Sequence, residues 1–310
     1  MRFNKLDLNL LVALDALLIE RNITRAAERI HLSQSAMSNA LGRLREHFDD
    51  ELLVQVGRRM EPTPRADVLR EAVRDVLMRI DTTISAQPEF DPTRSDREFT
   101  LFVSDYSMAV FIPHALALAS RQRSTARIRL LPQVAEPYRA LERGEADLLI
   151  IPSAYVSSEH PSEKLFEEEF VCAVWRDSQL ARGELTIERY VNAGHVVMQP
   201  TESSQPAYED WFVQQHGISR RIGCLTYSFG AMPFLVVGTE LIATVHLRLA
   251  RRLQAALPIA LKPLPLPMPL LEQTMQWHKY RSRDPGLVWL RSLMQQGAKA
   301  MDAELASGQP

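Results

Sequence analysis

Leucines recur at three- and four-residue steps near the start of the chain, from Leu8 to Leu18. This spacing places them on one face of a helix. Together with the polar breaks that follow, it predicts three successive helices at residues 7–21, 24–31 and 34–48. Asn22 or Thr24 could cap the second helix, and Ser33 is a favourable cap for the third, because their side-chain oxygens accept hydrogen bonds from first-turn amides.

The third predicted helix has two unlike faces. Its packed face carries the apolar residues Met37, Ala40, Leu41, Leu44 and Phe48. Its other face is mostly small and polar, with Gln34, Ser35, Ser38, Gly42 and Arg45. Short polar side chains let a helix enter the major groove of B-DNA and reach base edges. The pattern is typical of a helix-turn-helix, although an ordinary three-helix cluster with one solvated face would share it.

A hairpin is predicted directly after these helices. Residues 52–56 have the composition of a strand, Gly57 marks a turn, and prolines end a second short strand. Arg58 and Arg59 would lie at the tip, where they could enter a minor groove or hold phosphate, or be solvated. Residues 1–64 hold nine basic and nine acidic residues, so phosphate binding requires the basic side chains to share one face.

We predict a linker helix within residues 65–90. Its apolar stripe consists of Leu69, Val73, Val76, Leu77, Ile80 and Ile84. A helix of this kind must bury its stripe, either on its own domain or on the matching helix of a second subunit. The second arrangement, a dimerisation helix, is the one we favour.

Beyond Arg97, strand-like runs alternate with helix-like runs. Strands are predicted at residues 99–103, 127–131, 146–151, 170–175, 195–198, 222–227 and 241–245, and helices near 107–121 and 137–143. This alternation predicts mostly parallel sheets with helices on their faces. The proline-rich segment 258–269 is expected to cross between two subdomains, or to serve as a polyproline ligand. Residues 270–278 would then return as a strand, before a terminal helix over 285–305.

The composition is that of an ordinary globular chain. Hydrophobic residues make up 46% of the 310 residues, charged residues make up 24%, and the formal net charge is −2. These values exclude a disordered chain, a collagen-like fibre and a disulfide scaffold. A chain so close to neutral can bind a polyanion only through a local basic patch.

Two cysteines, Cys172 and Cys224, lie in apolar runs and are expected to be core thiols. They are too few for a zinc site, and no metal is expected. Asp7, Asn9 and Asp15 interrupt the N-terminal apolar stretch, which argues against a signal peptide. No apolar run reaches the roughly 18 residues of a membrane span. We therefore expect a cytoplasmic protein with no membrane contact.

The sequence also argues against an enzyme. It contains no HExxH, GxSxG, GxxxxGK[ST] or GxGxxG motif, and only 12 glycines. Asp105 and Glu202 could form a carboxylate pair, but no spacing requires one. A solute-binding protein would not carry the first ninety residues. We expect neither catalysis nor a cofactor.

The stretch ITRAAERIHLSQSAMSNALGRLREHF, followed by a Gly-Arg hairpin and PTPRA, resembles the N-terminal domain of LysR-type transcriptional regulators. The opening LDLNLLVALDAL and the later WHxxxxRDPGxxWLR resemble the branch that contains nodulation regulators and regulators of aromatic-compound catabolism. Ser35 stands where the family usually has proline, and either residue fits the first turn of a helix.

The resemblance implies an α/β chain in three parts. These are a winged helix-turn-helix DNA-binding domain over residues 1–64, the linker helix over 65–90, and a two-lobed, periplasmic-binding-protein-like effector domain over 91–310. Lobe 1 would comprise about 95–165 and 268–310, and lobe 2 about 166–267. The implied function is inducer-responsive transcription regulation, with activation as the outcome. The implied partners are double-stranded promoter DNA, a small-molecule inducer, further copies of the chain as a homodimer or homotetramer, and RNA polymerase.

The resemblance also assigns site residues for DNA. Those expected in the major groove are Gln34, Ser35, Ser38 and Asn39. Arg43 would hold phosphate, Arg58 or Arg59 would serve the wing, and Thr24 would cap its helix and contact phosphate.

Ligands of two-lobed α/β domains bind at the carboxyl ends of strands. The polar or aromatic residues at the predicted strand ends are Ser104, Asp105, Tyr106, Gln133, Gln199, Thr201, Glu202, Tyr227, Ser228, Phe229 and His278. Hydroxyls and helix amides suit a small carboxylate or a phenol, and Tyr227 and Phe229 suit an aromatic ring. At each position, capping or packing is the alternative role.

Overall fold

The computed structural model describes residues 7–57, 59–84, 89–134, 136–199, 217 and 220–307. The chain forms two compact units, whose boundary along the sequence falls after Gln87. Each unit has its own hydrophobic core.

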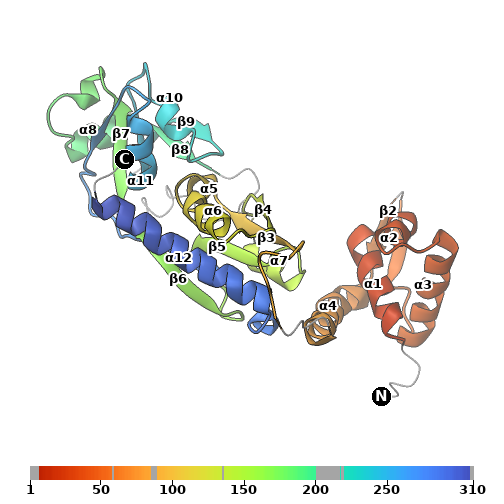
Figure 1. Ribbon diagram of the computed structural model, residues 1–310. Helices are drawn as coiled ribbons and strands as arrows, with labels where there is room; N and C mark the ends of the chain where they lie inside the picture. The colour runs from red at the N-terminus through yellow and green to blue at the C-terminus, as the bar shows by residue number, and fades with distance from the viewer. Residues whose placement is uncertain are drawn as a thin grey trace. The chain divides into compact units, whose positions relative to one another are not determined.

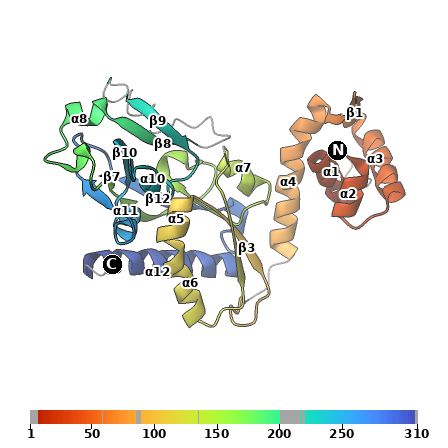
Figure 2. The same ribbon diagram turned by 90° about the horizontal axis from the view of Figure 1, so that it is seen from above.

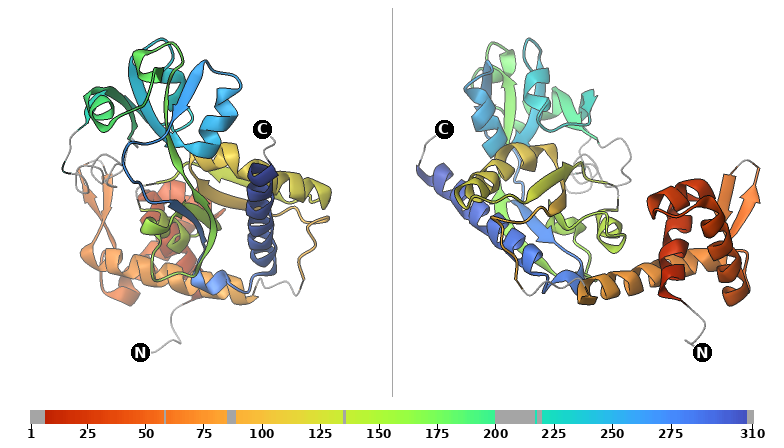
Figure 3. Two further views of the ribbon diagram at one scale, coloured as in Figure 1. Left: turned by 90° about the vertical axis from the view of Figure 1, so that its left-hand side faces the viewer. Right: turned by 45° about the vertical axis from the view of Figure 1, so that its right-hand side comes forward.

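The described residues of the N-terminal unit form four helices and a two-stranded hairpin (Figures 1 and 3). They are α1 (Leu8–Glu20), α2 (Ile23–Arg29), α3 (Gln34–Phe48), β1 (Leu53–Val56), β2 (Arg59–Pro62) and α4 (Pro64–Ile84). The three helices and the hairpin predicted from the sequence are confirmed to within two residues at each end. In the right panel of Figure 3 the hairpin, the wing, projects beyond the helices of its own unit.

Side-chain caps fix where these helices begin. Asn22 accepts a hydrogen bond from the amide of Arg25 at 3.0 Å, and Ser33 accepts one from Ala36 at 3.1 Å. Asn22 has an extended backbone, whereas Thr24 already lies inside α2. Asn22 is therefore the cap of α2, and the capping role that the resemblance gave to Thr24 is wrong.

The linker helix α4 packs on its own unit along part of its length. Val73 is buried, and Leu69 and Leu77 pack against the same core as α1. Arg74 also forms an ion pair with Asp15 of α1, with 2.8 Å between Nε and Oδ1. Part of the stripe therefore packs within its own unit, the alternative that the sequence left open, and pairing with a second subunit stays a prediction. Val76 remains 40% exposed.

The C-terminal unit contains two five-stranded sheets (Figures 1 and 2). The first has the strand order β4-β3-β5-β12-β6 and consists of β3 (Glu98–Val103), β4 (Arg127–Leu131), β5 (Leu148–Pro152), β6 (Ser162–Glu168) and β12 (Leu271–Gln276). The second has the order β11-β7-β10-β8-β9 and consists of β7 (Phe170–Trp175), β8 (Gly194–Met198), β9 (Arg221–Thr226), β10 (Leu241–His246) and β11 (Ile259–Lys262).

Helices cover these sheets. They are α5 (Asp105–Val110), α6 (Ile112–Arg121), α7 (Pro137–Glu142), α8 (Ile187–Asn192), α10 (Met232–Leu235), α11 (Leu247–Gln254) and α12 (Pro285–Ser307). Short 3-10 helices occur at Ser153–Tyr155, Gln179–Ala181 and Lys279–Arg281. Figure 2 shows α6 against the long α12, where a Cβ at Gly297 would lie 3.0 Å from the amide nitrogen of Ala115. The helix predicted near 107–121 is two helices, since α5 ends at Val110 and α6 begins at Ile112, with Pro113 in its first turn.

Both sheets are mixed, so the expectation of mostly parallel sheets is only half right. In the first sheet β3 runs parallel to β4 and β5, whereas β12 runs antiparallel to β5 and β6. In the second, β8 runs parallel to β9 and β10, whereas β7 runs antiparallel to β10 and β11. The sequence pattern also failed to predict β6 and β11. The strand β11 fits between Pro258 and Pro263 at a sheet edge, where prolines are tolerated.

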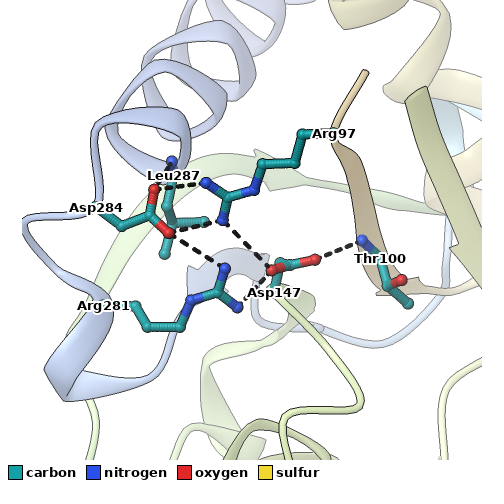
Figure 4. A network of polar contacts seen from close by, with 6 residues as sticks. All are labelled: Arg97, Thr100, Asp147, Arg281, Asp284 and Leu287. Carbon is teal, nitrogen blue, oxygen red and sulfur yellow. Dashed lines mark hydrogen bonds and ion pairs between the residues drawn. The ribbon is translucent and has the colours of Figure 1, made fainter. Parts of the chain in front are cut away.

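A network of two arginines and two aspartates ties the start of β3 to the start of α12 (Figure 4). Arg97 holds Asp284 through two hydrogen bonds of 2.7 and 2.6 Å. Arg281 pairs with both Asp284 and Asp147, and Asp147 accepts the amide of Thr100 at 2.7 Å. Burial alone would raise the pKa of Asp284, but the hydrogen bonds and positive charge of Arg97, with smaller help from Arg281, lower it to about 2.

We expect Asp284→Asn to lower the free energy of unfolding by about 2–3 kcal/mol near neutral pH, because a lowered folded-state pKa stabilises the ionised form. This contribution is fully present above the unfolded pKa of 3.8 and disappears as the pH falls toward about 2. Urea titrations at several pH values, followed by tryptophan fluorescence, measure it. Exposed Asp177→Asn is the control, and an Asp284→Asn deficit that does not change with pH would contradict the assignment.

Candidate DNA and effector sites

The polar face of α3 lies on the surface of the N-terminal unit. Gln34, Ser35, Ser38 and Asn39 are all exposed. The opposite face is anchored in the core by Met37, Leu41 and Leu44, which are 0, 3 and 0% exposed. Within this unit, the surface on which a helix-turn-helix would read bases is therefore uncovered. The hydroxyl of Ser35 lies 3.0 Å from that of Ser33, the cap of the helix.

The described candidates for contact with DNA phosphate are also on the surface of this unit. Arg43 on α3 is exposed, as are Thr24 on α2 and Arg59 at the start of β2. Arg58 lies outside the described residues. Arg45 was predicted to lie on the outer polar face of α3. Its guanidinium instead donates to the backbone oxygens of Glu51 and Leu53, at 2.9 and 3.0 Å.

In the C-terminal unit, the ends of parallel strands from the two sheets meet. Asp105 follows β3, and Ser228 follows β9. Asp105 Oδ2 accepts a hydrogen bond from the Ser228 hydroxyl at 2.6 Å and from the amide of Gly230 at 2.9 Å. One carboxylate oxygen therefore joins the two sheets at the edge where ligand-binding residues were predicted.

Five other candidates follow β3, β4, β8 or β9, the parallel strands of the two sheets. Ser104 caps α5 by accepting the amide of Ser107, and Gln133 donates to the backbone oxygen of Ile150 at 2.7 Å. Gln199 is exposed at the end of β8. Tyr227 is 76% exposed, and Phe229 packs partly buried against the cores of both sheets. Thr201 and Glu202 lie outside the part of the chain that the structure describes.

Tyr106 lies beneath this edge and has no exposed surface. Its hydroxyl donates to Glu168, which also pairs with Arg248 at 3.2 Å, and its ring stacks on His246 with centroids 3.7 Å apart. Burial raises the pKa of Glu168 and lowers that of His246 to about 3. The cluster of Tyr106, Glu168, His246 and Arg248 was missed in the sequence, because four residues so far apart carry no local signal of contact.

His278 lies at the opposite end of the sheet from the other candidates. It was placed with them because it ends a strand, but β12 is antiparallel to β5, with Gln276 opposite Leu149. The His278 side chain is buried, its Nδ1 accepts the amide of Tyr280, and its ring is 4.9 Å from that of His160.

The described residues contain no group of three or more His, Cys, Asp or Glu side chains arranged to hold a metal ion. Among those same residues, no helix has both the length and the apolar character to cross a membrane.

Comparison with known proteins agrees with this architecture. The family model of the bacterial regulatory helix-turn-helix protein, LysR family, matches residues 8–67, and that of the LysR substrate binding domain matches residues 93–299. The chain belongs to the LysR family. It is a transcriptional regulator with a DNA-binding helix-turn-helix and an effector-binding domain, and not an enzyme.

Relatives of this LysR-family regulator match along nearly the whole chain. Nodulation protein D 2 of Rhizobium leguminosarum bv. phaseoli is 41% identical over 97% of this chain and 95% of its own length. Nodulation protein D 1 of Rhizobium meliloti (strain 1021) is 40% identical over 98% and 99%.

Solved structures support the same fold. A probable transcriptional regulator from Pseudomonas aeruginosa is similar with a TM-score of 0.64 and 28% identity, over 94% of this chain and 97% of that one. A full-length variant of OxyR from the same organism has a TM-score of 0.71 at 16% identity, over 95% of both chains, and supports the fold alone.

We expect Asp105→Ala to loosen the contact between the two sheets. Two hydrogen bonds to a charged acceptor are lost, which should lower the unfolding free energy by about 1–3 kcal/mol. The amide of Gly230 should exchange with deuterium faster than in the unmodified protein. Asp177→Ala, a change at an exposed aspartate, is the control. Unchanged exchange at Gly230 would show that the contact does not protect this loop in solution.

Proposed function

We propose that this LysR-family regulator reads promoter DNA with the exposed face of α3 and that a small hydroxylated aromatic inducer controls it from the C-terminal unit. The observation that carries the DNA half of the proposal is the burial of Met37, Leu41 and Leu44, which turns Gln34 and Ser38 outward. An outward face of short polar side chains fits the major groove.

The proposed roles differ by residue type. Gln34 and Ser38 hydrogen bond to base edges, with Ser35 and Asn39 beside them, because amides and hydroxyls offer both donors and acceptors. The remaining candidates contact DNA phosphates and so position the protein without reading the base sequence. They are Thr24, Arg43, Arg58 and Arg59.

We further propose that two copies pair through the N-terminal unit. Apolar side chains remain exposed on α1 and α4: Leu8 at 54%, Val12 at 40%, Val68 at 77% and Val76 at 40%. A second subunit would bury them, and a two-fold axis would present two reading helices to a roughly palindromic site. Association into tetramers, DNA bending and contact with RNA polymerase belong to the same proposal, on the strength of the family alone.

The charge of the effector site favours a neutral ligand. The candidate set contains no lysine or arginine. Its aspartate, Asp105, accepts a hydrogen bond from Ser228, which is also a candidate. A ligand carboxylate beside Asp105 would meet a like charge, whereas phenolic hydroxyls could bond Gln133 or Gln199. The exposed ring of Tyr227 offers a stacking surface. The inducer must bind one arrangement of the protein better than another, since equal affinity shifts no equilibrium.

Replacing residues that contact bases and residues that contact DNA phosphates should affect DNA binding differently. Gln34→Ala or Ser38→Ala should weaken binding to the preferred operator by about 1–3 kcal/mol and relax the preference at one base position. Arg59→Ala should weaken binding to all sequences alike and reduce the dependence on salt. Selection of operators from a random DNA pool, followed by affinity titrations at several salt concentrations, measures both. Unchanged operator affinity in Gln34→Ala and Ser38→Ala would rule out this reading face.

Tyr227→Ala should reduce inducer affinity and leave DNA affinity nearly unchanged. Loss of one stacking ring should cost about 0.5–1.5 kcal/mol of ligand binding. The measurement is calorimetric titration with neutral hydroxylated aromatic compounds and, as matched probes, the corresponding aromatic carboxylates. Tighter binding of the carboxylates than of the neutral compounds would contradict the proposed ligand class.

A further inference from the structure

The Arg45 side chain joins the reading helix α3 to the first strand of the wing. Its Nε donates to the backbone oxygen of Glu51 at 2.9 Å, and its Nη2 donates to that of Leu53 at 3.0 Å. Leu53 lies opposite Pro62, and the neighbouring bond runs from the Thr63 amide to the Leu52 oxygen. The Leu53 oxygen therefore points to the outer edge of the two-stranded ribbon. Arg45 supplies a donor on this edge, beside which the described part of the chain places no further strand.

Asp50 joins the two strands at the base of the wing. Its Oδ1 accepts the amide of Leu52 at 2.7 Å, before β1, and the hydroxyl of Thr63 at 2.6 Å, after β2. Thr63 Oγ1 in turn accepts the amide of Ala66 at 3.1 Å, in the first turn of α4. The hydrogen bonds from Thr63 and Leu52 lower the pKa of Asp50, so the acceptor is ionised at neutral pH.

The backbone between α3 and the wing is held in an unusual conformation. Asp49 and Leu52 have φ values of 50° and 60°, in the left-handed region that residues other than glycine rarely adopt. Leu52 is also fully buried, so it cannot rotate out of this conformation without leaving the core. We call Arg45, Asp50, Leu52 and Thr63 the wing junction. Arg45 on α3, Asp50 in the connecting loop and Thr63 just before α4 each form hydrogen bonds at the base of the wing.

We propose that Arg45 and Asp50 are positioning residues for DNA binding, which act through the wing and do not contact DNA themselves. The inference rests on the proposed roles of α3 and of the wing tip, Arg58 and Arg59. A helix in the major groove and a wing in the adjacent minor groove engage the duplex at two places, whose separation is set by DNA geometry. A wing already fixed at that separation loses less conformational entropy on binding than one that moves about its base.

The competing role for Arg45 is direct contact with phosphate. Its side chain is 36% exposed and lies on the helix that carries the reading face, as the sequence pattern alone suggested. A phosphate contact requires only the positive charge, whereas the bridge to two backbone oxygens requires the planar fork of arginine. Lysine at this position keeps the charge and loses the bridge, so it separates the two roles.

The test is a double-mutant cycle on the full chain. The variants are Arg45→Ala, the wing-tip variant with both Arg58→Ala and Arg59→Ala, and their combination. We expect Arg45→Ala to weaken operator binding about tenfold in the unmodified protein but less than about twofold in the wing-tip variant, because residues that act through one another are not additive. Additive effects, with a reduced salt dependence for Arg45→Ala, would show direct phosphate contact and overturn the proposal.

Arg45→Lys gives a second test that does not depend on the stability of the alanine variant. We expect Arg45→Lys to lose operator affinity as Arg45→Ala does, and preserved affinity would overturn the proposal. Arg43→Ala is the matched control on the same helix, and its effect should add to that of the wing-tip variant. Thermal unfolding of each variant checks that the N-terminal unit remains folded.

Footprinting supplies the structural readout. In Arg45→Lys and Asp50→Asn, protection of the minor groove from hydroxyl radicals should weaken where the wing binds, while protection of guanine N7 in the major groove persists. Equal loss in both grooves would indicate a general structural role and overturn the proposal. Full operator affinity in the wing-tip variant would instead refute the wing contact in the proposed function, and with it the basis of this inference.

Discussion

The rotation of α3 about its own axis is the constraint on which the proposed reading surface depends. Three buried side chains, Met37, Leu41 and Leu44, fix that rotation because they occupy one stripe of the helix and fit into the core beside α1 and α2. The direction of the polar stripe is then no longer free. Gln34 and Ser38 face outward because no other arrangement buries the apolar stripe, so the proposed reading surface is a consequence of core packing.

Much of the N-terminal unit could be predicted from sequence, because its signals are local. The leucine spacing of α1, the Ser33 cap and the two-faced pattern of α3 each involve residues within a few turns of one another. Arg45 shows where local reasoning ends. Its position in the helix places it beside the outward face, but backbone oxygens of Glu51 and Leu53 draw its side chain toward the wing. Helical periodicity predicts the face of the helix on which a residue lies, but not which hydrogen-bond acceptor its side chain reaches.

In the C-terminal unit, the strands were predicted better than their directions. Hydrophobic runs locate β3, β5 and β12, but a run reads the same in a parallel as in an antiparallel strand. For β3 and β9 the parallel assumption placed Asp105 and Ser228 at facing ends, and they are in contact. For β12 it placed His278 at the wrong end of the sheet. The buried cluster around Glu168 could not be predicted, because Glu168 stands beside exposed acidic residues in the sequence and no local pattern distinguishes it from them.

Three consecutive residues at the start of α5 make contacts both within the first sheet and across to the second. Ser104 caps the helix, and Asp105 bonds Ser228 and Gly230 after β9 of the second sheet. Tyr106 bonds Glu168 of β6 in its own sheet and stacks on His246 of β10 in the second. Tyr106 and Glu168 are buried and can move only together, because separating them would leave polar groups unsatisfied in the core. Asp105 is partly exposed and bonds a loop, so it can exchange partners at smaller cost. A movement of the Ser228 loop away from Asp105 would therefore alter the contact between the sheets at this edge, while the buried stack of Tyr106 on His246 kept the sheets in contact.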